Sequence, residues 1–431
     1  MKKKISNFKF LISNYIRHPL FSGSAIMIFG TNLANFIAYI YHLAFGRILG
    51  PNEYGELATI ITLIGLLTSF YSFTSMVIIK VVSASEDKEV TGFFRFLNKY
   101  LSKIGLIVAV IIFLASPLIA SFIHIDLIKV SLIGPIFYFM LLGFVYKTFL
   151  QGLLRFTKIV IVTNLEMIGR LVLGLLFAYL GLSVFGGVSG ILVTVILIFF
   201  LARYYLKDIT SRLTFSQYKP GKELFKLSAP LVISSIAMNF FFSNDLVLVK
   251  HYFTTSEAGF YAAMATLGKI IFYGTGPVGA VMFPMISKRH SKSQGYRKIF
   301  LLSLFLTIAI ASFVLLIYYF FPEMAVKLLY GVKYLYVSQY IFTFGLYMAT
   351  FTTATLFLSY FLSIGKGKVA YAMVAASVLQ VIGIIRFHEN ITSVIKVLLV
   401  LSLSLLLFLI IYYIYSKEFR KEKSYSSKRS T

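Results

Sequence analysis

Continuous apolar runs of about 20 residues recur along the whole chain, separated by short polar segments. A run of that length crosses the hydrocarbon core of a membrane as a helix, whereas a membrane barrel would alternate apolar and polar residues. The pattern therefore predicts an all-α polytopic membrane protein with about 12 transmembrane helices. The predicted spans are 21–46, 55–79, 100–123, 127–149, 159–180, 183–204, 227–250, 258–285, 299–321, 336–362, 369–387 and 393–415.

The composition supports this class and excludes several others. Hydrophobic residues make up 59% of the 431 residues and charged residues only 13%, against about 25% charged residues in a soluble domain. Cysteine is absent, which excludes disulfides and thiolate chemistry. There is no Walker A or HExxH motif, and the six histidines are scattered. We therefore expect that the protein is not an enzyme. We also expect no catalytic residues, no cofactor and no metal.

The charge distribution predicts the orientation in the membrane. The chain has 41 Lys and Arg against 15 Asp and Glu, a net charge of +26. In a soluble protein this would indicate nucleic acid, but in a membrane protein basic residues gather in cytoplasmic loops beside an anionic leaflet. With loops assigned to alternate sides, 32 basic residues share the side of the N-terminus and 7 lie opposite. We predict a multi-pass protein of the cell (inner, cytoplasmic) membrane with both termini cytoplasmic and no nucleic-acid partner.

The segment 43–63 recurs, with partial identity, at 247–267, an offset of 204 positions. The matched pairs are Glu53 with Glu257, Gly55 with Gly259, Ala58 with Ala262, Thr62 with Thr266 and Leu63 with Leu267. Each copy predicts an apolar helix, a polar turn and a second apolar helix. Asn52 and Ser256 are the predicted N-caps, each followed by a glutamate in the first helical turn. Such a repeat is typical of a transporter built from two related halves.

The longest basic loop near the middle of the chain predicts the boundary between the halves. Because each half has six spans, the halves have the same orientation and are related by a pseudo-two-fold axis along the membrane normal. The predicted parts are a cytoplasmic interfacial segment at 1–20, an N-terminal six-helix bundle at 21–204, a basic cytoplasmic linker at 205–226, a C-terminal six-helix bundle at 227–415 and a basic cytoplasmic tail at 416–431.

Two equivalent spans carry stripes of polar residues on one helix face. The first stripe is Asn32, Asn35, Tyr39 and His42, and the second is Ser235, Asn239, Ser243 and Lys250. In one interpretation the stripes line a water-filled cavity between the halves. In the other they join helices through hydrogen bonds. We favour the cavity because Asn35 and Asn239 are equivalent in the repeat.

Charged residues inside a span are costly and usually face a cavity or a partner. Lys269 falls near the middle of span 8, which favours a ligand-facing cation over a structural pair. Asp245 has three candidate roles: pairing with Lys269, binding a coupling cation, or taking up a proton. Arg47, at the outer end of span 1, is either an interfacial anchor or a contact for an anionic ligand.

Two further features inside spans have mainly structural interpretations. Glu166 and Arg170 are spaced i,i+4 with the glutamate first, which predicts a self-neutralised pair within one helix. In span 8, the segment 274–279 contains Pro277, which removes one helical hydrogen bond. An interrupted helix at this depth lines a cavity, bends during a transport cycle, or is a plain kink.

Residues 46–55, Gly-Arg-Ile-Leu-Gly-Pro-Asn-Glu-Tyr-Gly, resemble the turn after the first span of polysaccharide-biosynthesis membrane proteins. Residues 228–231, 257–261 and 281–287 also resemble that family. Its members are O-antigen and lipid-linked-oligosaccharide flippases of the multidrug/oligosaccharidyl-lipid/polysaccharide (MOP) exporter superfamily. The resemblance implies two six-helix bundles in a V, with spans 1, 2, 7 and 8 lining a central cavity. Arg47 matches the arginine of the family's turn.

The resemblance implies a flippase that moves a polyprenyl-(pyro)phosphate-linked oligosaccharide from the cytoplasmic to the outer face by alternating access, for surface polysaccharide synthesis. The predicted substrate-binding residues are Asn35, His42, Arg47, Asn239, Asp245 and Lys269. Implied partners are the lipid-linked oligosaccharide, membrane lipids, a coupling ion (H⁺ or Na⁺) and other polysaccharide-assembly proteins. One alternative is a cation-coupled drug or metabolite antiporter of the same superfamily. A membrane glycosyltransferase or polysaccharide polymerase is the other, and the short outer loops disfavour it.

Overall fold

The structure, a computed structural model, describes residues 19–72, 74–85, 87–210 and 223–415. Every regular element within these ranges is a helix, as the apolar pattern predicts. The predicted interfacial segment 1–20 lies outside the described residues except for its last two, and so does the tail 416–431. The middle of the predicted linker, 211–222, lies outside them as well.

Ten helices in the described part of the chain are long and apolar enough to cross a membrane. Two of these regions, Ile26–Tyr71 and Phe156–Tyr205, have 46 and 50 residues. At 1.5 Å per residue each would be about 70 Å long, more than twice the hydrocarbon thickness. Each in fact contains two helices joined at a glycine with positive φ, Gly50 (+74°) and Gly181 (+91°). The ten helical regions therefore account for the 12 predicted spans.

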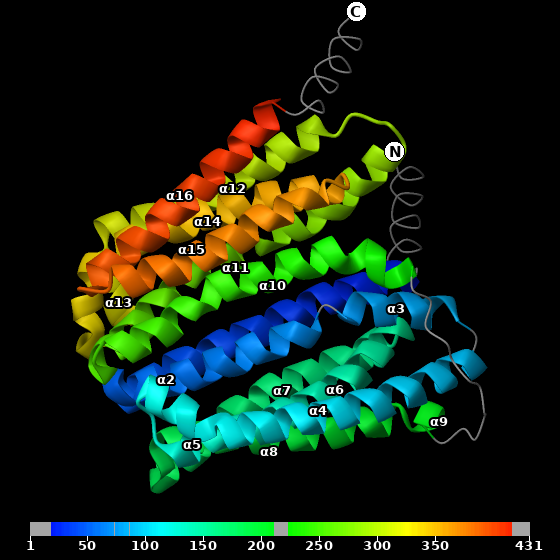
Figure 1. The fold of residues 1–431 in the computed structure, drawn as a ribbon, viewed down its shortest axis with the longest axis horizontal. Helices are drawn as coiled ribbons and strands as arrows, with labels where there is room; N and C mark the ends of the chain where they lie inside the picture. Colours follow the sequence, from blue (N-terminus) through cyan, green and yellow to red (C-terminus); the bar gives the residue numbers. More distant parts are fainter. Residues whose placement is uncertain (1–18, 73, 86, 211–222, 416–431) are drawn as a thin grey trace, which may run out of the picture. The chain divides into compact units, whose positions relative to one another are not determined.

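The helices are drawn in Figure 1. Most bounds agree with the predicted spans to within several residues. The helix that contains the predicted span 100–123 begins earlier, at Asp87, and the predicted span 55–79 is divided between one helix that ends at Ser72 and another that begins at Thr74. The long ones are α2 (Pro19–Ser72), α4 (Asp87–Ile123), α6 (Ile133–Gly152), α7 (Phe156–Phe177), α8 (Ser183–Tyr205), α10 (Glu223–Tyr252), α11 (Thr255–Ser291), α12 (Arg297–Phe320), α14 (Ser338–Ser363), α15 (Ala370–Arg386) and α16 (Ile391–Tyr415). The short ones are α3 (Thr74–Ala84), α5 (Leu127–Ser131), α9 (Lys207–Thr210), α13 (Pro322–Leu329), the π-helical η1 (Ala178–Leu182) and the 3₁₀-helical η2 (Val332–Val337) and η3 (Gly367–Val369).

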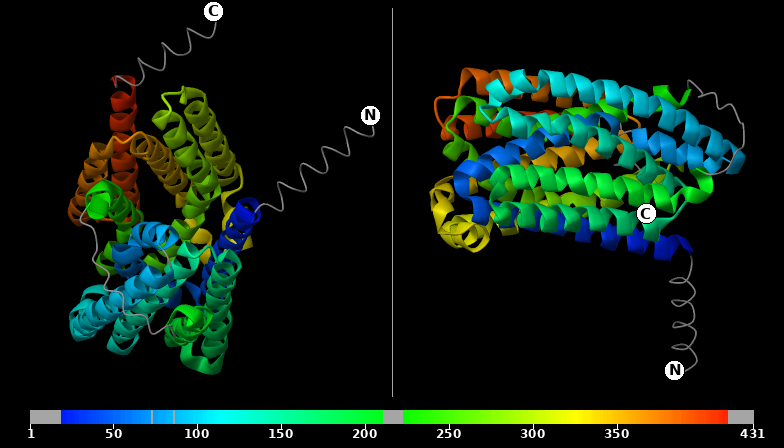
Figure 2. Two further views of the ribbon diagram at one scale, coloured as in Figure 1. Left: turned by 90° about the vertical axis from the view of Figure 1, so that its right-hand side faces the viewer. Right: turned by 90° about the horizontal axis from the view of Figure 1, so that it is seen from below.

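The chain forms two compact units. The first comprises the described residues of Met1–Phe45 and Leu67–Leu224, and the second those of Gly46–Leu66 and Phe225–Thr431. In the first unit, α4, α6, α7 and α8 run side by side around buried aromatic residues such as Phe149 and Tyr146. In the second, α11, α12, α14 and α16 pack together (Figures 1 and 2). Phe300 on α12 and Tyr360 on α14 are buried, with ring centroids 4.4 Å apart. The segment Gly46–Leu66, which runs from the end of the first predicted span through the turn into the second, packs with the second unit.

The two copies of the repeat touch each other inside the second unit. A Cβ added to Gly55 would lie 2.7 Å from the backbone nitrogen of Gly259, and a Cβ added to Gly259 would lie 1.7 Å from the carbonyl oxygen of Pro51. Thr59 and Ala263, one turn further along each helix, are also fully buried. Small residues four apart let membrane helices approach backbone to backbone. Gly55 and Gly259, matched in the sequence repeat, therefore form one close helix crossing.

The predicted N-caps need a correction. Thr254, and not Ser256, caps α11: its side chain accepts a hydrogen bond from the Glu257 backbone N–H (3.3 Å), and the Glu257 carboxylate accepts one from the Thr254 N–H (3.0 Å). This is a capping box, which needs its glutamate three residues after the cap. In the other copy the helix breaks at Gly50, and Pro51 follows as the first helical residue, where its missing N–H costs nothing. Gly50 and Thr254 are again 204 positions apart, so the repeat holds although both caps lie two residues earlier than predicted.

Tyrosine hydroxyls fix the first repeat copy in the second unit. The Tyr54 side chain is fully buried, and its hydroxyl lies 3.1 Å from that of Tyr330 and 3.3 Å from that of Thr266. The Tyr334 hydroxyl donates to the Gly46 carbonyl at 3.0 Å. Buried hydroxyls need such partners, so Gly46–Leu66 is held by specific bonds as well as by close packing.

Replacing Gly259 with alanine should force the two helix starts apart, because the new methyl group would meet the Pro51 carbonyl. We expect a loss of about 1–3 kcal/mol of stability, the usual cost of overpacking. Gly276→Ala is the matched control: it lies in the same helix, and a Cβ added there would meet nothing within 4 Å. The measurement is thermal unfolding of the purified protein in detergent, and equal melting temperatures for the two variants would contradict the close crossing.

Candidate functional site

In the second unit, a buried carboxylate on α10 lies near a lysine on the neighbouring helix α11. Asp245 on α10 is 2% exposed and accepts a hydrogen bond of 2.6 Å from the Tyr261 hydroxyl on α11. Lys269, two turns beyond Tyr261, is partly buried. Its ammonium lies 4.4 Å from the centroid of the Phe242 ring, within the range of a cation–π contact.

Asp245 and Lys269 attract each other without forming a close ion pair. The two side chains are near enough to attract each other when both are charged, yet among the described residues no ion pair of 4.0 Å or less includes either side chain. Asp245 is satisfied chiefly by the Tyr261 hydroxyl, and Lys269 by the Phe242 ring. Of the six predicted site residues, the structure brings these two together. The Lys269 ammonium therefore keeps hydrogen-bonding capacity for a further anion.

Two residues of the predicted polar stripe on α10, Asn239 and Lys250, form hydrogen bonds with nearby residues. Asn239 is half-buried, and its side-chain amide donates to the Ser235 carbonyl of its own helix at 3.0 Å. Lys250 is fully buried at the end of α10 and donates to the Thr255 hydroxyl at 3.2 Å. Asn244, which does not belong to the predicted stripe, is 4% exposed, and neither its amide nitrogen nor its amide oxygen has a hydrogen-bond partner. Its place between Ser243 and Asp245 is the only sequence signal that could have singled it out.

Asn35 and His42 lie in the first unit, on α2 before the break at Gly50. Asn35 is exposed. His42 is half-buried, and its ring meets the neighbouring Tyr41 ring edge to face with centroids 5.9 Å apart. The contacts of these two residues within their unit indicate no particular ligand chemistry.

Arg47 forms a structural contact in the second unit. Its guanidinium donates to the carbonyl of Leu329 at 3.0 Å and to that of Leu328. These carbonyls end α13, where a helix leaves acceptors unpaired and carries a partial negative charge. Arg47 thus caps α13, and this contact already uses two of its five N–H donors.

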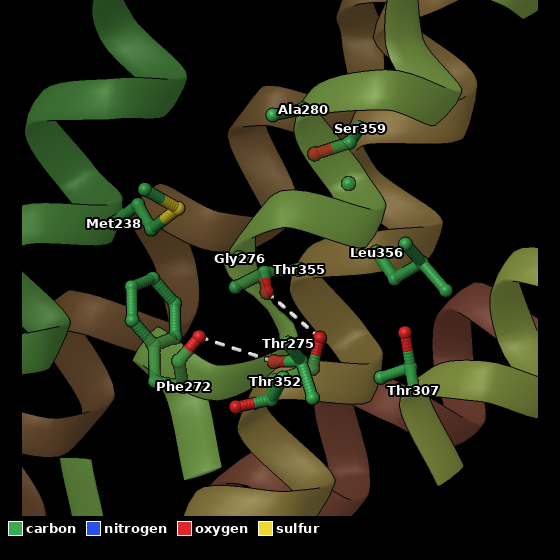
Figure 3. Close-up of a pocket in the computed structure, with 11 residues that line it drawn as sticks. Met238, Phe272, Thr275, Gly276, Ala280, Thr307, Thr352, Thr355, Leu356 and Ser359 are labelled. Carbon is green, nitrogen blue, oxygen red and sulfur yellow. Dashed lines mark hydrogen bonds between the residues drawn. The ribbon is translucent and has the colours of Figure 1, made fainter. Parts of the chain in front are cut away.

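The second unit also contains a hydroxyl-lined cavity of about 160 Å³ (Figure 3). Four threonines from α11, α12 and α14 lie around it: Thr275, Thr307, Thr352 and Thr355. The Thr275 hydroxyl donates to carbonyls of its own helix, and that of Thr355 to the Thr352 carbonyl at 2.8 Å. The buried hydroxyls of Thr307 and Thr352 have no partner. Buried polar groups of this kind usually bond to water or to a ligand.

The segment 274–279 lines this cavity through Thr275, Gly276 and Gly279. Helix α11 continues through Pro277 as a single helix. Of the three interpretations of the proline segment, the structure supports lining of a cavity. The threonines of α12 and α14 were not predicted from the sequence. Thr307 is the sole threonine of α12 and gives no signal of its own, whereas Thr352 and Thr355 belong to a cluster of four threonines at 350–355 that could have been singled out.

The first unit carries a charge cluster in the membrane region. The predicted pair of Glu166 and Arg170 is confirmed as an i,i+4 salt bridge, and Lys147 on α6 adds a second ion pair to the same carboxylate at 2.7 Å. The Glu166 side chain is almost fully buried, whereas both cations are partly exposed. One carboxylate therefore balances two cations. In the residues that the structure describes, no group of three or more His, Asp and Glu side chains gathers to hold a metal ion.

Comparisons with known proteins indicate a family and a fold. The family model described as "Polysaccharide biosynthesis protein" matches residues 44–339. A solved structure described as "Lipid II flippase MurJ, inward closed conformation" matches at a TM-score of 0.72 and 14% identity, over 93% of this chain and 90% of that chain. The "inward-facing conformation of a multidrug resistance MATE family transporter of the MOP superfamily" matches at 0.70 and 14%, over 90% and 96%. The search of the curated proteins gave no match. The structural likenesses show that the chain has the fold of these two transporters, as the family resemblance implied.

Removing the negative charge of Glu166 should destabilise the first unit. In Glu166→Gln, the positive charges of Lys147 and Arg170 would no longer be balanced by the carboxylate. Removing one partner of a buried ion pair costs about 3–5 kcal/mol of stability. We expect a clearly lower melting temperature in detergent. Glu89→Gln, at an exposed position, is the control and should change stability by no more than about 0.5 kcal/mol. Equal melting temperatures for both variants would contradict the proposed cluster.

The hydroxyls in the cavity can be tested with an isosteric change. Thr307→Val and Thr352→Val each remove a hydroxyl that has no protein partner, so we expect melting temperatures equal to or above that of the wild type. Thr355→Val removes a hydroxyl bonded to the Thr352 carbonyl and should cost about 0.5–1.5 kcal/mol. A similar loss in all three variants would show that the two unpartnered hydroxyls are already bonded to water inside the cavity.

Proposed function

Because the chain belongs to the polysaccharide biosynthesis protein family, we propose that it is a flippase for a polyprenyl-(pyro)phosphate-linked oligosaccharide. The protein is a multi-pass membrane protein with the fold of MOP transporters. We propose that it lies in the cell membrane with both termini cytoplasmic, and that it moves its substrate from the cytoplasmic to the outer face for surface polysaccharide synthesis.

The observation that carries the proposal is the position of Lys269. A lysine inside a membrane helix is expensive and is usually retained for a ligand or an ion path. Here it is balanced only at a distance by Asp245, and its nearest described partner is the Phe242 ring. A phosphate or pyrophosphate group would supply the direct negative partner that Lys269 lacks. The neighbouring hydroxyl-lined cavity would offer hydrogen bonds to a neutral sugar.

The physical need for such a protein follows from the substrate. A sugar head group cannot cross about 30 Å of hydrocarbon without losing its hydration. Polar side chains within the membrane replace that hydration, while the polyprenyl chain stays in the lipid. No covalent bond is broken, so no catalytic residue is needed. An H⁺ or Na⁺ gradient, the membrane potential or consumption of the product downstream would drive the movement.

The remaining predicted residues have less support as substrate contacts. Asn35 and His42 remain proposed contacts on the first unit. Arg47 would reach a substrate only with the donors left over from capping α13. Asn239 would have to turn its amide away from the Ser235 carbonyl. Asp245 would act through its electrostatic attraction to Lys269. The substrate phosphate would compete with the carboxylate for the lysine.

Asp245 also keeps a second function open, a cation-coupled drug or metabolite antiporter. A buried carboxylate bonded to a tyrosine hydroxyl is a suitable group for taking up a proton or binding a cationic substrate. The family match favours the flippase, because this family is described by polysaccharide synthesis.

The flippase proposal predicts a specific charge requirement at position 269. In proteoliposomes containing a fluorescent polyprenyl-diphosphate oligosaccharide, Lys269→Gln should slow translocation about 10- to 100-fold, since a hydrogen bond to a charged group is worth about 1.5–3 kcal/mol. Lys269→Arg should keep most of the activity. Lys292→Gln, an exposed position at the end of the same helix, is the matched control and should behave like the wild type.

Deletion of the gene in its host tests the flippase proposal independently of the proteoliposome assay. Accumulation of lipid-linked oligosaccharide on the cytoplasmic face, relieved by the wild type but not by Lys269→Gln, is the expected result. A normal distribution of this lipid together with changed drug sensitivity would contradict the flippase proposal and support the antiporter proposal. Loss of polymer with the intermediate already on the outer face would point to a polymerase.

A further inference from the structure

A second pocket, in the first unit, is lined by basic residues and contains no acidic one. It has a volume of about 570 Å³ and lies between α4, α6 and α8. Arg95 and Lys99 come from α4, and Arg203 comes from the last turn of α8. Polar and aromatic side chains complete the wall, among them Asn98, Ser102, Tyr138 and Tyr146.

Two acidic side chains of the first unit, Asp208 and Glu166, are engaged by other basic residues. Asp208 accepts hydrogen bonds from Arg155, one at 2.8 Å, and these bonds hold the pKa of its carboxyl below the ordinary value. Glu166 is bound by Lys147 and Arg170. Among the described residues, Lys99 and Arg203 form no ion pair within 4.0 Å, and both are exposed. These two side chains therefore bring positive charge to the pocket that no described carboxylate neutralises by direct contact.

The surface next to the pocket is apolar and follows one face of α4. Ile104, Ile107, Ile111, Leu114 and Leu118 are all exposed and are spaced three or four residues apart. Phe96 and Tyr100, with ring centroids 4.5 Å apart, lie at the basic end of this stripe. Aromatic side chains are typical of the membrane–water boundary, and an apolar stripe beyond them is typical of contact with acyl chains. A ligand with a charged head and an apolar tail matches both parts.

We propose that this pocket binds the head group of an anionic phospholipid, with its phosphate among Arg95, Lys99 and Arg203 and its acyl chains along the exposed face of α4. Guanidinium and ammonium groups are the usual partners of phosphate, and basic pockets between membrane helices on the cytoplasmic side bind anionic lipid head groups. The buried side-chain oxygen of Asn98 has no partner and would accept a hydrogen bond from a head group with hydroxyls, such as phosphatidylglycerol. This site does not depend on the substrate proposed above.

The test measures lipid binding to the purified full-length protein by native mass spectrometry. Phosphatidylglycerol and phosphatidylcholine with the same acyl chains are compared with a polyprenyl diphosphate and with inorganic phosphate. Lys99→Gln should weaken phosphatidylglycerol binding about fivefold, and Lys99→Gln with Arg203→Gln about 25-fold, because one basic residue at an anionic lipid surface contributes about 1 kcal/mol. Lys103→Gln, exposed on the same helix but outside the pocket, is the matched control and should change binding less than about twofold.

Each outcome decides the proposal. Selective loss of phosphatidylglycerol binding in the pocket variants, with Lys103→Gln unaffected, supports it. Unchanged binding in Lys99→Gln, a position too exposed to be needed for folding, overturns it. Loss confined to the polyprenyl diphosphate would overturn it too and make the pocket an entry site for the transported substrate. Competition by inorganic phosphate as effective as that of the phospholipid would instead make it a free-phosphate site.

Discussion

The close crossing of Gly55 and Gly259 is the contact on which the second unit depends. Helices in a membrane gain no hydrophobic energy by associating, so they rely on close backbone packing and on hydrogen bonds between helices. At this crossing the Pro51 carbonyl leaves no room for one extra methyl group. The hydroxyl contacts of Tyr54 and the cap that Arg47 provides for α13 then secure the same segment. Gly46–Leu66 consequently packs with the second unit, while the described residues of Leu67–Leu224 pack with the first.

The two units manage charge within the membrane in different ways. In the first, Glu166 is bound directly by two cations, which satisfies the carboxylate and locks three side chains in place. In the second, the nearest described partners of Asp245 and Lys269 are a tyrosine hydroxyl and an aromatic ring. A directly bonded cluster stabilises a fold and is costly to break. Asp245 and Lys269 form no direct ion pair, so the lysine can still attract a third charged group such as a phosphate. For this reason we propose that the substrate binds at Lys269.

Local patterns account for what the sequence could predict. Apolar run length predicts the spans, a fixed offset of 204 positions relates equivalent residues of the two turns, and i,i+4 spacing predicts the bond between Glu166 and Arg170. Partners that are distant in the sequence could not be predicted in the same way. Lys147 reaches Glu166 from another helix, Arg47 meets carbonyls about 280 positions away, and the hydroxyl-lined cavity needs three helices to exist. Even the cap at Thr254 was available in the sequence as a capping box, but Ser256 looked equally suitable without the backbone geometry.

The chemistry of the proposed cargo explains why a single strong site would be unsuitable. A lipid-linked oligosaccharide has a highly charged phosphate part and a neutral sugar part, and a transporter must both bind and release it. A cation already balanced in part by Asp245 attracts phosphate without trapping it, because releasing the phosphate restores the attraction of the carboxylate. Hydroxyls such as those of Thr307 and Thr352 offer a sugar hydrogen bonds of ordinary strength. Favourable entry combined with weak, divided binding is the general condition for passage through a membrane protein, and the second unit has the side chains to meet it.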